Sequence, residues 1–440
     1  MKTGIDRLRF SYGGELFAGQ GFMEWNPTDG FHLEALLDKN FAPVDSFKTL
    51  GQVIINDKGD AFNIWLKVRG FGSAIAPNVF PLAQKQSLIT DNHLSLSLKR
   101  IIFFFQWPKE PEEVEESWMG SAVFLTKTEL EFPDSVKLET SLAGRLIEAQ
   151  STTGLSHEDK NNVSFSGRQL TNKSFELNWA LSKSCWTKTD AWHFGEAARR
   201  ALSIIFAQTI WIAKTRIRRG HVDVLDLRKH ETVESLKYNF RPLIDIDHSG
   251  LKQRTFNKDA FLQLIVLFSK GGNHAETCWN IFHQMADASR QETWQCRELL
   301  LSTILEAIFR TINNRPFKAG GFYRAKDRKE DMERFQRKFL AEKWGRACEN
   351  ALRIHTRLRH RNAHPDWLTT PNGVLSKEEL RQSTANLIFL SRFYGYMILA
   401  MAGFKDLEPL FPVVRFSDDL QPPTQSPVLP PPVANVQKLV

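Results

Sequence analysis

Apolar and polar residues alternate along the first half of the chain, in short segments separated by turn-forming residues. Phe62–Val68 is the clearest case, because Phe, Ile, Leu and Val occupy every second position. The cluster Asn26–Gly30 separates two other such segments. A two-residue period bounded by Asn, Pro, Asp and Gly predicts strands and hairpins. Further strands are expected at Gly19–Trp25, Phe31–Leu36, Gln52–Asn56, Ile101–Trp107, Ser121–Leu125, Phe175–Ala180, Ile210–Ile217 and His221–Leu227.

After residue 250 the apolar residues recur three and four positions apart, which is the period of an amphipathic helix. One such helix, Ala191–Gln208, is also expected within the β-rich part. The predicted fold class is α+β, with a β-rich, sandwich or barrel-like domain over residues 1–250 and an all-α bundle over residues 251–415. The helices expected in the bundle are Asn257–Lys270, His274–Ala286, Arg290–Asn313, Asp327–Gly345, Arg346–His364 and Ser376–Gly403.

The composition agrees with two folded domains and a basic surface. The chain has 440 residues, of which 42% are hydrophobic, so it can form real cores. Its formal net charge of +8 permits a nucleic-acid partner. The proline-rich residues 416–440 predict a disordered or polyproline tail.

Neither the cysteines nor the hydrophobic segments indicate metal binding or membrane insertion. The four cysteines lie far apart and include no CxxC pair, which argues against structural zinc and against a disulfide framework. The N-terminus has no apolar signal-peptide core, and polar residues interrupt the apolar stretch Ala385–Phe404. We therefore expect a cytoplasmic protein without a membrane partner, a metal or another cofactor.

Cationic residues crowd the end of the predicted helix Arg346–His364. The segment Arg357–His364, which we call the cationic helix end, holds three arginines and two histidines. A helix C-terminus favours positive charge, so a solvated cap is one interpretation. The other is a site for phosphate chemistry, because a guanidinium binds two phosphate oxygens and a histidine can move protons near neutral pH.

The cationic helix end carries a family resemblance. Arg359–His364 matches R-x4-H, and Arg357–His364 matches R-x6-H. Both resemble the R-x4-6-H motif of HEPN domains, which are all-helical and in many cases metal-independent ribonucleases. A β-rich first half containing Trp25, Pro27 and Gly30, ahead of such a bundle, resembles the ApeA-type HEPN proteins of bacterial anti-phage defence.

The resemblance implies an endoribonuclease of abortive-infection defence that cleaves RNA by attack of the ribose 2′-OH. It implies Arg359 and His364 as catalytic residues, with Arg357 as the alternative for the working arginine. Arg357, Arg361 and Asn362 would bind RNA. In the family an asparagine commonly follows the catalytic arginine directly, whereas here Asn362 follows Arg361 and not Arg359.

The resemblance also implies partners. HEPN ribonucleases generally pair two motifs across a homodimer, so RNA and a second copy of the chain are expected, with a phage-derived trigger at the β-rich domain. Two alternatives stay open. One is a non-catalytic HEPN-like module that binds nucleotides or proteins, and the other is an interaction scaffold whose helix end is only a cap.

Other segments carry weaker signals. Glu306 is a lone carboxylate in an apolar helical run, which favours an exposed or ion-paired side chain and a site role about equally. Arg324–Lys329 predicts a solvated helix of mixed charge, with an extended RNA track as the alternative. Asp245–His248 has metal-binding residue types but no second cluster, and His221–Asp226 predicts a structural strand. The sequence has no Walker A, GxGxxG or GxSxG pattern.

Overall fold

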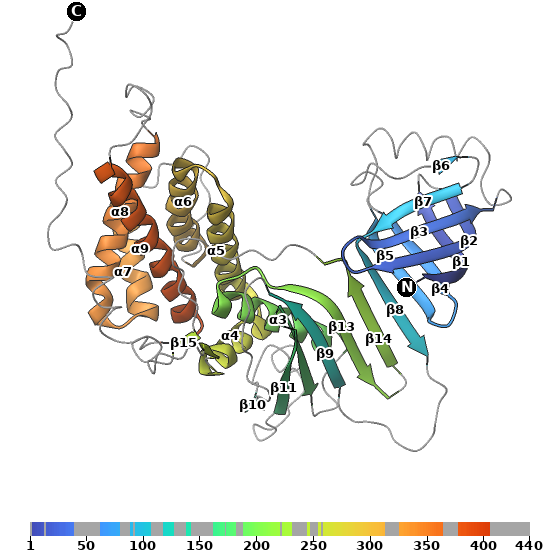
Figure 1. The fold of residues 1–440 in the computed structure, drawn as a ribbon. Coiled ribbons are helices and arrows are strands. Elements are labelled where there is room, and N and C mark those ends of the chain that lie inside the picture. The colour runs from blue at the N-terminus through green and yellow to red at the C-terminus, as the bar shows by residue number, and fades with distance from the viewer. Residues whose placement is uncertain are drawn as a thin grey trace, which may run out of the picture. The chain divides into compact units, whose positions relative to one another are not determined.

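The computed structural model divides the chain into two compact units (Figure 1). The first, the sheet unit, comprises Met1–Arg199 and Ile210–Val233, and the second, the helical unit, comprises Arg200–Thr209 and Glu234–Val440. The structure describes residues 2–12, 15–38, 62–79, 89–90, 93–106, 118–126, 138–141, 162–171, 173–181, 188–220, 222–230, 244–246, 254–256, 258–312, 325–363 and 377–404.

One antiparallel sheet dominates the sheet unit, and a large sheet followed by helices confirms the α+β class. The strand order is β10-β11-β12-β9-β13-β14-β8-β5-β4-β1-β2-β3-β7-β6. The strands are β1 (Lys2–Tyr12), β2 (Glu15–Asn26), β3 (Gly30–Leu37), β4 (Phe62–Val68), β5 (Gly72–Val79), β6 (Ile89–Thr90), β7 (His93–Leu98), β8 (Arg100–Gln106), β9 (Trp118–Leu125), β10 (Leu138–Ser141), β11 (Asn162–Thr171), β12 (Ser174–Leu181), β13 (Trp211–Arg219) and β14 (Val222–Arg228).

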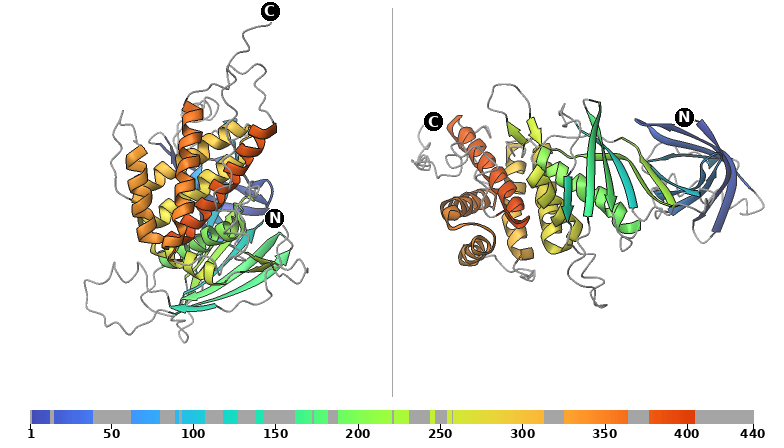
Figure 2. Two further views of the ribbon diagram at one scale, coloured as in Figure 1. Left: turned by 90° about the vertical axis from the view of Figure 1, so that its left-hand side faces the viewer. Right: turned by 90° about the horizontal axis from the view of Figure 1, so that it is seen from below.

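The first part of this sheet closes on itself through one bent strand. Along the chain only Lys99 separates β7 from β8, yet β7 pairs with β3 and β8 pairs with β5. The strand order from β3 to β5 runs through β2, β1 and β4, so the segment 93–106 completes a circuit. Figure 2 shows the curl near the N-terminus. The sheet is thus curled and barrel-like, which is one of the two arrangements that the strand pattern predicts.

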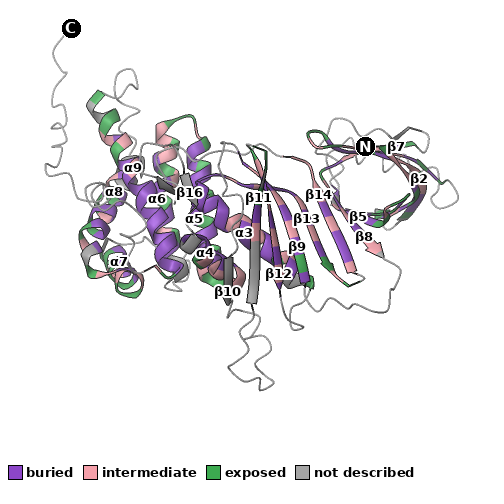
Figure 3. Ribbon diagram, turned by 60° about the horizontal axis from the view of Figure 1, so that its bottom comes forward, coloured by how far each residue is buried: buried purple, intermediate pink, exposed green. Residues whose placement is uncertain are grey.

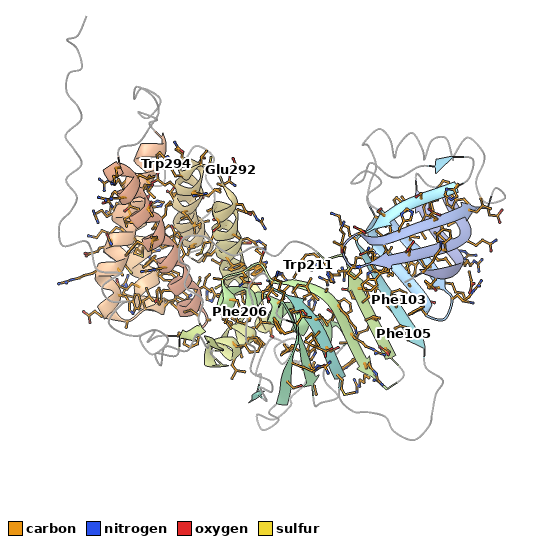
Figure 4. The ribbon with its side chains drawn as sticks, in the orientation of Figure 1. Phe103, Phe105, Phe206, Trp211, Glu292 and Trp294 are labelled. Atoms are coloured by element: carbon orange, nitrogen blue, oxygen red, sulfur yellow. The ribbon has the colours of Figure 1, made fainter. Side chains whose placement is uncertain are left out.

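The interior of the curl is a core of aromatic and aliphatic side chains. Phe10 stacks on Phe17 and Phe62, with ring centroids 4.9 and 5.1 Å apart. Phe103 and Phe105 of β8 pack with this core (Figure 4). Buried and exposed residues alternate along β4, as Figure 3 shows for the strands in general, because successive side chains point to opposite faces.

The strand predictions were incomplete in a specific way. Phe62–Val68 is confirmed residue for residue as β4, whereas Gln52–Asn56 lies outside the described residues. Strand β1 was missed because its register shifts between Ile5 and Leu8, which breaks the two-residue period. Strand β5 was missed because its buried residues include the small Ala74 and Ala76.

Helix α3 (Lys188–Phe206) packs against the second part of the sheet through Trp179 of β12. The Trp179 ring is buried and lies 5.4 Å from the Phe194 ring of α3, measured between centroids. Gly120 of β9 is directly opposite Trp179, and a Cβ at Gly120 would lie 2.1 Å from the indole. A Cβ at Gly195 of α3 would lie 3.1 Å from the same ring. Gly120 is therefore required for the indole to fit.

Replacing Gly120 by Ala should lower the free energy of unfolding by about 1–3 kcal/mol, because the added methyl group displaces the Trp179 ring within a packed core. Urea-induced unfolding followed by circular dichroism measures the loss. Gly4→Ala is the matched control in another strand of the sheet, because a Cβ at Gly4 meets only the Arg69 side chain, at 3.5 Å. Equal stability of the two variants would show that the indole moves without cost.

Two buried carboxylates on β14 are bound by arginines. Asp226 accepts hydrogen bonds from Arg100 at 2.9 and 3.0 Å and from Arg228 at 2.8 Å. Asp223 accepts one from Arg216 Nε at 2.9 Å, and this hydrogen bond raises the pKa of Arg216. Asp223 and Asp226 therefore have the structural role that the strand pattern predicted for this segment.

The helical unit contains the helices that the three- and four-residue spacing predicted, with shifted ends. No described helix is long and apolar enough to cross a membrane. Two short strands, β15 (Ile244–Ile246) and β16 (Arg254–Phe256), form a separate pair before the helices. The helices are α4 (Lys258–Lys270), α5 (Gly272–Arg290), α6 (Trp294–Ile312), α7 (Ala325–Phe339), η1 (Glu342–Trp344), α8 (Gly345–Ala363) and α9 (Lys377–Met401).

The predicted helix Asp327–Gly345 is wrong at its C-terminal end. Helix α7 ends at Phe339, and the short turn η1 precedes α8. Leu340 and Trp344 are both buried, and the Trp344 ring lies 5.2 Å from the Tyr396 ring of α9. The break lies at Ala341, whose backbone is extended, and the four-residue spacing of Leu340 and Trp344 would equally suit one face of a continuous helix, so the apolar pattern did not reveal it.

Candidate active site

The cationic helix end occupies the last turns of α8. Helix α8 buries one side, which includes Ala351, Ile354 and Leu358. The described part of α8 extends to Ala363, and Pro365 disfavours helical geometry in the residue before it. The predicted site therefore begins where a well-packed helix ends.

The sequence-predicted site residues are described to different extents. The Arg357 side chain is half-buried and makes contacts within the protein. Arg359, Arg361 and Asn362 are described only as positions in α8, and His364 lies outside the described residues.

Helical geometry distributes the cationic positions around α8. At about 100° per residue, position 359 lies roughly 40° from His355, and position 362 lies roughly 20° from it in the other direction. Positions 357 and 361 lie roughly 160° and 120° away. Because His355 is on the buried side of α8, positions 359 and 362 continue that side, whereas 357 and 361 do not.

Next to this helix end, three ionisable side chains from three helices meet in the interior. The Nε2 atom of His355 on α8 lies 3.5 Å from Oε1 of Glu306 on α6. The same carboxylate oxygen lies 3.6 Å from Nη1 of Arg328 on α7. The exposed fractions of the three side chains are 1%, 16% and 9% in that order, so the charges are largely withdrawn from water. We call these residues the buried triad.

The buried triad holds His355 in its neutral form at neutral pH. Burial lowers the pKa of His355 to about 4, and the positive charge of Arg328 contributes to the lowering. The backbone of Ser302 opposes the lowering of the pKa of His355 but does not reverse it. Although the Glu306 carboxylate lies 3.5 Å from His355, burial of the imidazole and the nearby positive charge of Arg328 disfavour a second cation at this position.

The polar contacts continue along α6 to α9. Glu298, Ser302 and Glu306 occur at every fourth position, so they share one face of α6. Ser383 of α9 donates a hydrogen bond to Oε1 of Glu298, and both residues are buried. The hydroxyl group of Tyr394 on α9 donates to the backbone oxygen of Leu301 at 2.7 Å. Directional contacts, and not only apolar packing, thus fix how α6 and α9 meet.

The buried triad is suited to positioning and not to direct contact with a large substrate. Its charges are compensated internally, and little of its surface reaches solvent. What it can do is fix α8 relative to α6 and α7, since a buried charged pair tolerates little displacement. Position 359 lies one helical turn beyond His355, so the triad also fixes the backbone from which Arg359 projects.

Sequence reasoning anticipated one member of the triad and missed two. Glu306 was singled out, and its ion pair with Arg328 is one of the two roles considered for it. The prediction that Arg324–Lys329 is part of a solvated helix is wrong for Arg328, which is buried, as is nearby Asp331. His355 was missed, although its spacing from the apolar Ala351 and Leu358 is a signal that it belongs to the buried side.

Among the described residues, no group of three or more His, Cys, Asp or Glu side chains could hold a metal ion. The segment Asp245–His248 is described only in part, since His248 lies outside the described residues. Burial raises the pKa of the Cys348 thiol to about 12, so this thiol is not a reactive nucleophile at neutral pH.

Comparisons with known proteins give no further guide to the site. The chain matches no family model, no curated protein and no solved structure.

Proposed function

We propose that the chain is a metal-independent endoribonuclease of the HEPN type that acts in bacterial anti-phage defence, with Arg359 and His364 as its catalytic residues. One observation carries the proposal: the cationic helix end follows directly on the part of α8 that the buried triad anchors within a helical unit. Catalytic groups need a rigid supporting framework, because they must be held within about 0.5 Å of a productive geometry.

The reaction uses the substrate's own nucleophile. The ribose 2′-oxygen loses its proton to a histidine and forms a bond to phosphorus, while the bond from phosphorus to the 5′-oxygen breaks. The leaving 5′-oxygen takes up a proton, so the products are a 2′,3′-cyclic phosphate and a 5′-hydroxyl. The guanidinium of Arg359 stabilises the negative charge that develops on the phosphorane oxygens.

One motif supplies one histidine, whereas the reaction involves two proton transfers. A homodimer that brings two helix ends together would provide the second histidine, so we propose that the active form is a dimer of the helical unit. Arg357, Arg361 and Asn362 bind RNA in this scheme, and the two arginines contribute affinity that depends on salt more than on sequence. The sheet unit would sense a phage-derived trigger.

The experiment is a cleavage assay with the purified full chain and RNA in the presence of EDTA. Wild type is expected to give products with 2′,3′-cyclic phosphate and 5′-hydroxyl ends. His364→Ala should slow cleavage by about 10²–10⁴-fold, through loss of proton transfer. Arg359→Ala should slow it by about 10²–10³-fold, through loss of charge stabilisation.

Arg346→Ala is the matched control, because Arg346 is an exposed arginine at the other end of α8. It should cleave at the wild-type rate. A folded His364→Ala protein that cleaves like wild type would refute the proposal and favour a non-catalytic nucleotide- or protein-binding module. Loss of cleavage in Arg357→Ala but not in Arg359→Ala would reassign the catalytic arginine.

A further inference from the structure

A large aromatic side chain is exposed in the middle of the curled sheet. Trp65 lies on β4, which is flanked by β1 and β5, so it is not at a sheet edge. The residue is 56% exposed, while its neighbours Ile64 and Leu66 are buried in the core. Within the described part of the chain, the indole makes no ring contact and lies under no cation. The indole is therefore available for a ligand.

Three cations surround Trp65 on the same outer face. Arg9 of β1 is directly opposite Trp65, and Arg7 of β1 is directly opposite Lys67 of β4. Like charges directly opposite each other in antiparallel strands are destabilising, so the Arg7–Lys67 pair has a cost in the protein alone. A polyanion bound across the pair would remove that cost.

No carboxylate among the described residues neutralises these cations. Among the described residues, Arg7, Arg9 and Lys67 form no ion pair, whereas the nearby Arg69 is bound by Asp6 at 2.9 Å. The Nε atom of Arg9 is buried and has no hydrogen-bond partner among the described residues. This atom is withdrawn from the surface, so direct phosphate contacts fall first to the exposed Arg7 and Lys67, while Arg9 adds positive charge between them and the indole.

An apolar row extends from Trp65 across the sheet. Ile75 of β5 is opposite Trp65, and Ile102 of β8 is opposite Ile75. Both isoleucines are half-buried and face outward, because their neighbours in sequence belong to the core. Adjacent strands are about 4.8 Å apart, so the row adds roughly 10 Å of flat apolar surface beside the indole.

We propose that this outer face, centred on Trp65, is a binding site for single-stranded nucleic acid. An unpaired base stacks on the indole and its neighbour lies along the isoleucine row, while Arg7, Arg9 and Lys67 bind the phosphates. Flat aromatic surfaces interleaved with cations bind single strands in this way. A duplex satisfies the cations but cannot present an unpaired base to the indole. The site is independent of the cleavage chemistry proposed for the helical unit.

The test is fluorescence anisotropy of the full chain with a labelled 2′-O-methyl oligonucleotide of about twelve residues, within the range that single-strand sites cover. This probe has no free 2′-OH and so cannot be cleaved by the proposed reaction. Trp65→Ala should weaken binding by about 10- to 100-fold, and Trp65→Phe should retain most of the affinity. Arg7→Ala and Lys67→Ala should each reduce the slope of log K against log salt by about 0.7.

Leu36→Ala and Lys173→Ala are the matched controls, because these residues are exposed elsewhere on the sheet unit. Neither should change binding, and Trp65→Ala should keep the thermal midpoint of wild type. His364→Ala should bind like wild type, which separates this proposal from the nuclease proposal. The inference is overturned if Trp65→Ala binds as tightly as wild type, or if wild type prefers a duplex of equal length. The affinity for a DNA oligonucleotide of the same sequence shows whether the 2′ substituent of the sugar contributes to binding.

Discussion

Replacing Glu306 by Leu should lower the free energy of unfolding by about 3–5 kcal/mol, because it removes from the interior a carboxylate that lies 3.6 Å from the Arg328 guanidinium. The two side chains are 16% and 9% exposed, so water cannot take over the role of the carboxylate. The loss should be seen in urea-induced unfolding of the full chain, followed by the helical circular dichroism signal at 222 nm.

A second variant distinguishes charge from packing. The double variant with Glu306→Leu and Arg328→Met removes both charges, and such replacements are often neutral or stabilising, so it should recover most of the loss. Asp287→Ala is the control for a surface pair, since Asp287 and Arg290 lie 3.1 Å apart and are about half exposed. It should cost less than about 1 kcal/mol. An unchanged unfolding midpoint for Glu306→Leu would mean that other groups compensate Arg328.

A more conservative substitution of the same residue, Glu306→Gln, separates the role of the buried triad from that of the cationic helix end. If the triad positions α8, Glu306→Gln should reduce RNA cleavage through a lower kcat while leaving RNA affinity nearly unchanged, because Arg357 and Arg361 remain. A change in affinity alone would contradict this positioning role. Cleavage that is independent of Glu306 would show that the helix end is rigid without the triad.

Regular periodicity made much of the fold predictable. The helices were expected because their apolar residues recur at three and four positions, and β4 was expected because its alternation is unbroken. Closure of the sheet was not predictable, because it depends on the pairing of β7 with β3 and of β8 with β5, residues distant in sequence. Pairing partners of this kind leave no local pattern.

The candidate site was likewise predictable only where its residues lie close together in the sequence. The cationic helix end is a local cluster, so it was visible in the sequence. The triad joins Glu306, Arg328 and His355 from three helices, and only Glu306 was conspicuous, as a charge in an apolar run. Arg328 was hard to recognise among the charged residues around it. The strand period placed Trp65 on the face opposite the core residues of β4, but it did not indicate a ligand there.

His355 should make the protein sensitive to mild acid. Its pKa is lowered from the ordinary value of 6.5 to about 4 by burial and by Arg328, so the folded state resists protonation that the unfolded state accepts. The contribution of neutral His355 to the free energy of unfolding is therefore fully present above pH 6.5 and is lost as the pH falls toward 4. A shift of this size corresponds to about 3 kcal/mol.

The measurement is the free energy of unfolding between pH 7.5 and pH 4 for wild type and for His355→Gln, which cannot take up a proton in this range. Carboxylates elsewhere titrate in both proteins, so the difference between the two curves isolates His355. The variant should be less stable than wild type at pH 7.5, because it disturbs a packed interior, but its stability should fall about 3 kcal/mol less on acidification. Parallel curves would show that His355 is protonated as readily in the folded state as in the unfolded state. In that case burial and Arg328 would not hold His355 neutral, and the protonated imidazole would pair with the Glu306 carboxylate 3.5 Å away.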